Sequence, residues 1–118
     1  MKKILIIDDA QDCRQVIKTM LKKYDLDIIE ANDGLEGWRT IIKEKPDLVL
    51  LDIHMPLKDG FEILKDIEEE WLDVPVIIIS GDTSPNTMNA CLLNGASAFI
   101  NKPVMKNDFN NILKFIRA

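Results

Sequence analysis

The chain has 118 residues, which is enough for one compact domain with its own core and too short for two ordinary domains. Hydrophobic residues make up 47% of it and charged residues 30%, a globular balance that excludes a disordered or collagen-like chain. The formal net charge of −5 argues against nucleic acid or an anionic membrane as a direct partner.

The chain carries no recognisable membrane or export segment. No apolar run approaches the roughly 20 residues that span a bilayer. Residues 1–7 lead straight into Asp8 and Asp9, without the longer apolar core of a signal peptide. We therefore expect a cytoplasmic protein in which Cys13 and Cys91, far apart in sequence, are buried, reduced thiols.

Five short apolar runs recur along the chain and predict five strands. They are residues 4–7, 28–29, 48–51, 76–79 and 98–100. Apart from the second, each is nearly continuous rather than alternating, which is typical of strands buried on both faces of a parallel sheet. The second run is short and flanked by Asp27 and Glu30, so we expect a weak strand at an edge of the sheet.

Apolar residues at spacings of three and four follow each run and predict five amphipathic helices. The stripes expected to face the sheet are Cys13, Val16, Ile17, Met20, Leu21 and Tyr24; Leu35, Trp38, Ile41 and Ile42; Phe61, Leu64, Ile67 and Trp71; Met88, Cys91 and Leu92; and Phe109, Ile112, Leu113 and Ile116. Five β–α units in succession predict an α/β domain over residues 1–118, with an open parallel sheet and right-handed crossovers.

The polar residues that end the predicted strands are the candidate functional residues, because ligands of open α/β sheets bind beyond the carboxyl ends of the strands. Asp8 and Asp9 follow the first run, Asp52 the third, Ser80 the fourth and Lys102 the fifth. If the first and third strands are neighbours, three carboxylates converge, and a charged pair at about 4 Å costs roughly 4 kcal/mol at an effective dielectric of about 20. The cluster therefore requires cations, for which we expect the lysine and a hard divalent ion, Mg²⁺.

With these residues in place, the sequence resembles the receiver domain of two-component response regulators over essentially its whole length. The resemblance rests on Asp8-Asp9, on Asp52 within the stretch from residue 50 to residue 60, on Ser80-Gly81, on Gly95-Ala96 and on Lys102-Pro103, all in order and at matching spacing. It implies a single flavodoxin-like (βα)5 doubly wound domain, with a five-stranded parallel sheet in the order 2-1-3-4-5.

The resemblance also implies how the site works. Asp52 is the expected phosphoryl acceptor, and Asp8, Asp9, Asp52 and the backbone carbonyl of His54 are the expected ligands of Mg²⁺. Lys102 is expected to pair with Asp52 and then with the phosphoryl group.

The resemblance also implies two residues that change conformation when the acceptor is phosphorylated. Ser80 is expected to hydrogen-bond a phosphoryl oxygen, and Phe99 stands where the family has its switch aromatic. Together they would couple phosphorylation to the face made by the fourth helix, the fifth strand and the fifth helix. The Lys102–Pro103 peptide is expected to be cis.

The first helix is implied to dock the phosphodonor. Its polar face carries Arg14, Lys18 and Lys22, which we expect to form the partner surface. The resemblance thus implies a phosphorelay module that accepts a phosphoryl group from a histidine kinase or a histidine phosphotransfer domain and then signals to a downstream protein target. Its expected catalysis is limited to its own phosphotransfer and autodephosphorylation.

Three alternatives are weighed against this one. A receiver-like docking scaffold that is never phosphorylated would be expected to lose an acidic or lysine position, and none is lost. A Mg²⁺-dependent aspartyl phosphohydrolase would want a second Asp two residues after its nucleophile, where this chain has His54, and a cap domain that 118 residues leave no room for. A flavin or nucleotide binder would want a Gly-rich loop where Asp8 and Asp9 stand.

Overall fold

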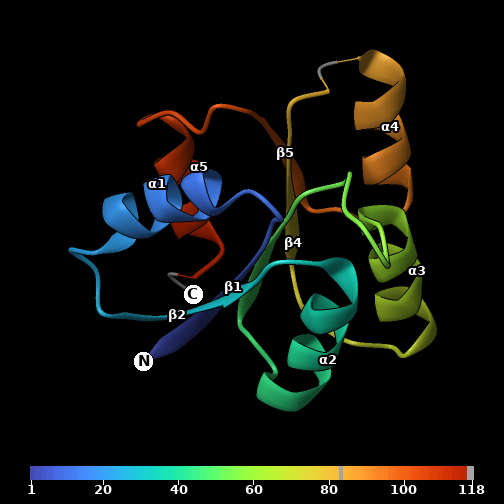
Figure 1. The fold of residues 1–118 in the computed structure, drawn as a ribbon, viewed down its shortest axis with the longest axis horizontal. Coiled ribbons are helices and arrows are strands. Elements are labelled where there is room, and N and C mark those ends of the chain that lie inside the picture. Colours follow the sequence, from blue (N-terminus) through green and yellow to red (C-terminus); the bar gives the residue numbers. More distant parts are fainter. Residues whose placement is uncertain (83, 117–118) are drawn as a thin grey trace.

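A computed structural model of the chain describes residues 1–82 and 84–116. Within them strands and helices alternate in the order β1 (Lys2–Ile7), α1 (Gln11–Leu21), β2 (Leu26–Ala31), α2 (Gly34–Glu44), β3 (Leu48–Leu51), α3 (Gly60–Glu69), β4 (Val76–Ser80), α4 (Pro85–Leu93), β5 (Ala98–Asn101) and α5 (Asp108–Lys114). All neighbouring strands are parallel, in the order β2-β1-β3-β4-β5 (Figure 1). The predicted fold class is therefore confirmed.

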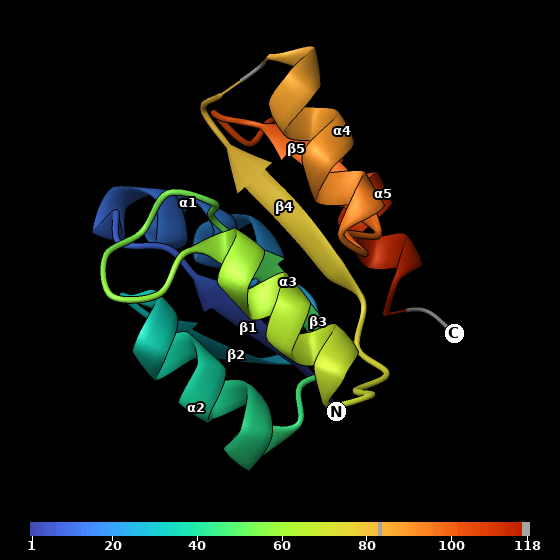
Figure 2. The same ribbon diagram turned by 90° about the vertical axis from the view of Figure 1, so that its right-hand side faces the viewer.

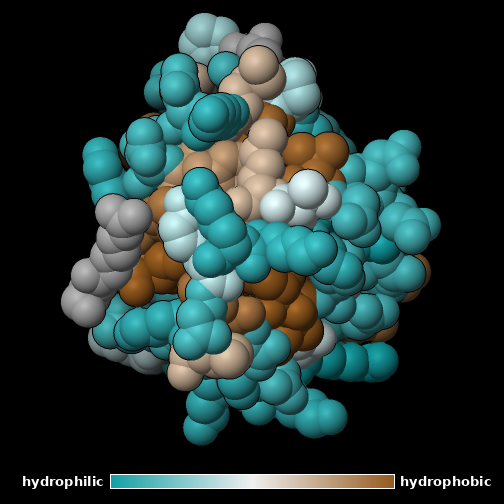
Figure 3. Space-filling model, turned by 90° about the vertical axis from the view of Figure 1, so that its left-hand side faces the viewer, coloured by the Kyte–Doolittle hydropathy of each residue, from teal (hydrophilic) through white to brown (hydrophobic). Residues whose placement is uncertain are grey.

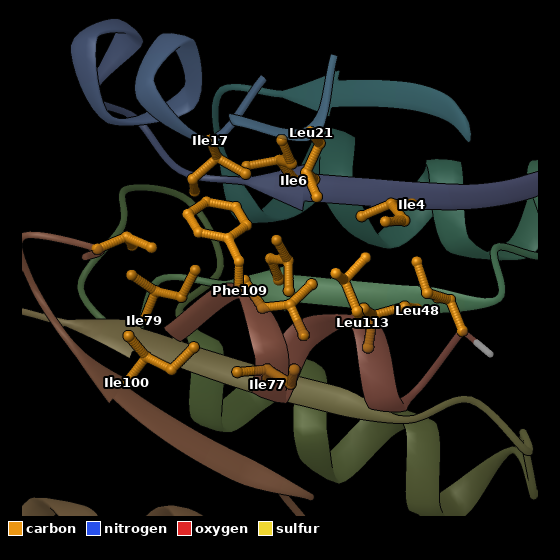
Figure 4. Packing of buried hydrophobic residues seen from close by; sticks show 14 residues of the cluster. Ile4, Ile6, Ile17, Leu21, Leu48, Ile77, Ile79, Ile100, Phe109 and Leu113 are labelled. Atoms are coloured by element: carbon orange, nitrogen blue, oxygen red, sulfur yellow. The ribbon is translucent and has the colours of Figure 1, made fainter. Parts of the chain in front are cut away.

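Helices cover both faces of the sheet, which explains the continuous apolar runs (Figure 2). Because side chains alternate along a strand, Ile4 and Ile6 of β1 point toward α1 and α5, whereas Leu5 and Ile7 point toward α2, α3 and α4. The side chains between the sheet and helices α1 and α5 form one hydrophobic core, and those on the other face form a second. Figure 4 shows the first of these cores, with Phe109 of α5 beside the α1 residues. Two cores thus hold the strands rigidly and fix where their carboxyl ends lie.

Local signals begin and end the helices. The Asp33 side chain caps α2 by accepting a hydrogen bond from the Glu36 backbone, and Asp59 forms a capping box with Glu62 at the start of α3. Gly95 follows α4 with φ of 101°, a conformation that favours glycine, so that β5 starts only three residues later.

The second strand lies at the edge of the sheet as predicted, but it is longer than the sequence indicates. It has six residues, the same number as β1, and pairs with β1 in register from Lys2↔Leu26 to Ile7↔Ala31. An edge strand buries less side-chain surface than a central one, so its backbone pairing tolerates polar residues that obscure the pattern.

Several residues of the predicted helix stripes do not face the sheet. Exposed large apolar side chains include Val16, Leu35, Ile42, Trp71 and Leu92. The prediction fails most clearly for Trp71, because α3 ends at Glu69 and Trp71 takes a left-handed backbone conformation with φ of 55°. In the described part of the chain, no helix is long and apolar enough to cross a bilayer.

Candidate functional site

The three carboxylates predicted to converge meet at the carboxyl ends of β1 and β3. The register Ile7↔Leu51 places Asp8 and Asp52, the next residues, side by side, and the Asp52 backbone N–H donates to the Ile7 carbonyl oxygen at 2.9 Å. Carboxylate oxygens of Asp8, Asp9 and Asp52 lie within 4.8 Å of one another. Asp8 and Asp52 are buried and Asp9 is exposed, so the cluster opens to solvent on one side.

Lys102 joins this cluster from the end of β5. Its Nζ lies 3.0 Å from Asp8 Oδ2 and 3.2 Å from Asp52 Oδ2. The Lys102 backbone N–H donates to the carbonyl oxygen of Ser80 at 2.8 Å, and the Lys102–Pro103 peptide is cis. The pairing with Asp8 was not anticipated from the sequence, which pointed only to Asp52.

Burial and like charge shift the ionisation of the cluster. Burial raises the pKa of the Asp52 carboxyl above its ordinary value, the negative charge of Asp8 raises it further, and Lys102 opposes both effects. Burial alone would lower the pKa of the Lys102 ammonium, but its hydrogen bond to Asp8 and the charges of Asp8 and Asp52 outweigh burial and raise it. The Lys102 ammonium therefore stays charged, whereas the ionised Asp52 carboxylate is unfavourable in the folded protein.

The donor set fits a hard divalent cation. Three carboxylates and one ammonium leave two negative charges, which is the charge that one Mg²⁺ neutralises. Asp8 Oδ1 accepts a hydrogen bond from the Ala10 backbone at 2.8 Å, and Asp52 Oδ1 accepts one from the His54 backbone at 3.3 Å. These bonds orient the two buried carboxylates, while the exposed Asp9 leaves the cluster open to solvent.

Ser80 and Phe99 lie on neighbouring strands beside this cluster. The buried Ser80 Oγ accepts a hydrogen bond from the Asp82 backbone N–H at 3.0 Å. Phe99 is opposite Ile78 in the β4–β5 register and packs, half-buried, on the same face as α4. Ser80 lies two residues beyond Ile78 on β4, so its side chain is on the face of the sheet on which the Phe99 ring packs.

Comparison with known proteins identifies the family. The model of the response regulator receiver domain matches residues 4–114. The chain belongs to this family. Its structural neighbours are also receiver domains of two-component response regulators. The chain superposes on the activated N-terminal receiver domain of Klebsiella pneumoniae RstA with a TM-score of 0.89 at 30% identity, and the match covers 99% of this chain and 100% of that one.

Curated relatives contain this receiver domain as one part. The probable C4-dicarboxylate response regulator DctR of Bacillus subtilis is 38% identical over 104 residues, covering 86% of this chain and 46% of that protein. The response regulator-like protein PRR73 of Oryza sativa subsp. indica is 31% identical over 118 residues, covering 97% of this chain and 15% of that protein. The chain therefore spans less than half the length of both relatives.

Part of the predicted partner surface of this receiver domain is already occupied. Arg14 Nε lies 3.1 Å from Glu30 Oε1 and Lys18 Nζ lies 3.0 Å from Glu30 Oε2, so both cations turn toward β2. Arg14 also donates to the backbone carbonyl oxygen of Asp8. The hydrogen bond from Lys18 chiefly lowers the pKa of Glu30. Lys22 is exposed, and the assignment of this face to the phosphodonor stays a prediction.

The face of α1 that remains free has a different character. Asp12, Gln15, Val16, Thr19 and Met20 line a shallow, largely apolar hollow on it. Figure 3, which views the side of the molecule that carries α1, shows apolar surface between hydrophilic side chains. The first helix therefore carries an apolar hollow in addition to its charged side chains.

Two further side chains, those of His54 and Cys13, border the receiver site, and only the one of Cys13 was not predicted there. His54 Nε2 lies 3.8 Å from Asp82 Oδ2 and links the loops that follow β3 and β4. Cys13 is half-buried rather than fully buried, and burial together with a hydrogen bond to Asp8 raises the pKa of its thiol to about 12. Cys13 lies in the first turn of α1, directly after the Asp8-Asp9 pair, and this position could have placed the thiol beside the site, but no family motif marks it.

Proposed function

We propose that Asp52 is the phosphoryl acceptor of this receiver domain and that a histidine kinase or a histidine phosphotransfer domain is the donor. The observation that carries the proposal is the Asp52 carboxylate, buried at the mouth of an acidic cluster and paired with Lys102 at 3.2 Å. A carboxylate oxygen of Asp52 forms a bond to phosphorus as the phosphorus–nitrogen bond of the donor's phosphohistidine breaks. The imidazole nitrogen keeps the electron pair of that bond.

The surrounding residues lower the barrier by meeting the charge of the incoming group. Asp8, Asp9, Asp52 and the backbone carbonyl of His54 would hold Mg²⁺, which when bound supplies positive charge for the phosphoryl oxygens. Lys102 would shift its ammonium from the Asp52 carboxylate to the new phosphoryl group.

Signalling would start from the hydroxyl of Ser80. Its Oγ accepts from the Asp82 backbone, so its own proton is available to a phosphoryl oxygen on Asp52. Reorienting this side chain frees space next to Phe99, and repacking of that ring would alter the face made by α4, β5 and α5. A downstream protein that distinguishes the two arrangements would read the state of Asp52.

The alternatives have less support. A phosphohydrolase lacks its general acid, because the exposed His54 side chain stands where such an enzyme has Asp. A scaffold that is never phosphorylated would have no use for the two buried carboxylates held beside Lys102. Catalysis by this domain would be confined to gaining and losing its own phosphoryl group, and residues 1–118 would form one receiver domain.

The experiment is intact-protein mass after incubation with acetyl phosphate, with and without Mg²⁺. We expect a single base-labile phosphoryl adduct that requires Mg²⁺ and is absent from Asp52→Asn. A folded native protein that takes no adduct would overturn the phosphoryl-acceptor proposal and favour the scaffold.

A further inference from the structure

A groove lies between the carboxyl-terminal ends of α3 and α4, at the opposite end of the sheet from Asp52. Two adjoining hollows, of about 570 and 610 Å³, share Glu68 and Asn94. The hollow of about 570 Å³ is lined by Ile67, Leu72 and Val76, the first residue of β4, whereas the far end of that strand reaches the Asp52 site. In Figure 2, β4 is seen between the two helices that enclose this groove.

Two apolar side chains stand at the rim of this groove. Trp71 is 92% exposed and Leu93 is 87% exposed, the highest values among the large hydrophobic residues in the described part of the chain. Trp71 lines one hollow and Leu93 the other. Because an indole buries a large apolar area with little conformational freedom to lose, an exposed Trp at a groove is a favourable anchor for a partner.

The rim of the groove also carries several carboxylates, and they lie at a helix C-terminus, where negative charge is destabilising. Glu68 and Glu69 are the last two residues of α3, Glu70 is its C-cap residue, and Asp73 follows. A helix carries partial negative charge at its C-terminus, so carboxylates there are unfavourable. Neither α3 nor α4 has a basic residue in its last turn, in contrast to Lys18, Lys43 and Lys114 in the last turns of α1, α2 and α5.

Little within the chain offsets this charge. Lys65 and Glu69 form an exposed pair at 3.9 Å, with the lysine first, which is the weaker orientation on a helix. Within residues 1–82 and 84–116, no ion pair involves Glu68, Glu70 or Asp73. The groove therefore combines two exposed apolar side chains with negatively charged ones. The partial negative charges at the C-terminal ends of α3 and α4 add to this negative potential.

We propose that this groove binds a cationic amphipathic helix of a partner protein. The apolar face of that helix would lie between Trp71 and Leu93, and its Lys or Arg residues would flank the apolar face and meet the acidic end of α3. A second copy of this chain would place the same acidic rim against itself, and an anionic lipid surface would be repelled. The site is separate from the phosphoryl chemistry and would give the domain a second partner surface.

The test uses a synthetic amphipathic helix of about 18 residues built from Leu and Lys, with a Leu/Glu peptide of the same pattern as control. The ¹⁵N-labelled chain is titrated by NMR. We expect saturable shifts at the Trp71 indole and at amides near Leu93, and no binding of the Leu/Glu peptide. We also expect the affinity for the Leu/Lys peptide to fall as salt rises.

Matched variants separate this groove from general attraction. Trp71→Ala and the double variant Glu68→Gln/Glu69→Gln are each expected to weaken binding about tenfold or more. The control Leu57→Ala removes an apolar side chain that is 76% exposed on another part of the surface. The control Asp25→Asn/Asp27→Asn removes the same charge from the loop before β2 and the start of that strand. Both controls are expected to change affinity less than about twofold.

Several outcomes would overturn the proposal. They are shifts centred on α1 or on the Asp8 cluster, equal weakening by the Asp25→Asn/Asp27→Asn control, and the absence of saturable binding. A free chain that sediments as a dimer and becomes monomeric in Trp71→Ala would assign the groove to a second copy instead. Because Trp71 is exposed, its variant is expected to fold and to retain the Mg²⁺-dependent adduct, which keeps this test independent of the phosphorylation test.

Discussion

The Lys102 ammonium lies 3.2 Å from the Asp52 carboxylate, although fifty residues separate them in the chain. The same ammonium is 3.0 Å from Asp8, so one cation joins the ends of β1, β3 and β5. It is the positive charge that pairs with two buried carboxylates, one of which is the proposed phosphoryl acceptor. Its loss should therefore affect both chemistry and stability.

Lys102→Met is predicted to slow phosphoryl uptake from acetyl phosphate by about 10²–10³-fold, because a preorganised charge at the transferring group is lost. The measurement is the rate at which the adduct appears by intact-protein mass at a fixed Mg²⁺ concentration. Lys106→Met, which removes an exposed lysine four residues further on, serves as the control. An uptake rate for Lys102→Met equal to that of the control would show that the ammonium plays no part in the transfer.

Asp52→Asn is predicted to raise the free energy of unfolding at about pH 7 without Mg²⁺, by on the order of 1 kcal/mol. The folded pKa of Asp52 is raised, chiefly by burial and then by Asp8. The carboxyl therefore favours the fold below its ordinary value of 3.8 and loses that contribution as the pH rises through the folded value.

Urea unfolding at about pH 7 and about pH 4 tests the sign of this effect. The gain from Asp52→Asn should shrink as the pH falls, because wild-type Asp52 then becomes neutral as well. A gain that is independent of pH would mean that charge is not its cause, and a loss of stability at about pH 7 would contradict the unfavourable burial of this carboxylate.

Mg²⁺ is predicted to stabilise the fold, since the assembled carboxylates exist only in the native state. The gain in free energy of unfolding is about 2.7 kcal/mol at a concentration 100 times the dissociation constant. Asp9→Asn should reduce this gain strongly, whereas Asp12→Asn, also exposed but outside the cluster, should not. Thermal unfolding across a Mg²⁺ titration measures it, and equal gains in both variants would place the ion elsewhere.

Gly34→Ala is predicted to cost about 1–3 kcal/mol of unfolding free energy. A Cβ on this glycine would lie 1.5 Å from the carbonyl oxygen of Lys58, so α2 and the loop after β3 could not keep their approach. Gly81→Ala is the control, because a Cβ there meets no atom within 4 Å. Urea unfolding of the two variants compares them, and similar stabilities would show that the loop yields easily.

Much of the fold could be predicted from the sequence because the sheet is buried on both faces. Continuous apolar runs in β1, β3 and β4 leave few alternatives, and the order of the strands followed from the resemblance rather than from periodicity. The weak run of β2 understated a six-residue strand, because an edge strand depends more on its backbone pairing with β1 than on apolar side chains.

The convergence of Asp8, Asp9, Asp52 and Lys102 could likewise be predicted, since parallel strands deliver their last residues to one edge. Pairings across elements could not. Helical spacing cannot tell that Arg14 and Lys18 reach Glu30 on β2, or that Trp71 leaves its helix stripe through a left-handed backbone. Such features depend on tertiary distances that local periodicity does not encode.

The identity of the phosphorylated residue tests the central claim most directly. The acetyl phosphate adduct would be reduced with borohydride, which converts an aspartyl phosphate to homoserine, and the peptides would be sequenced by mass spectrometry. We expect homoserine at position 52 and unmodified Asp8 and Asp9. Homoserine at either of those positions, with position 52 unmodified, would contradict it.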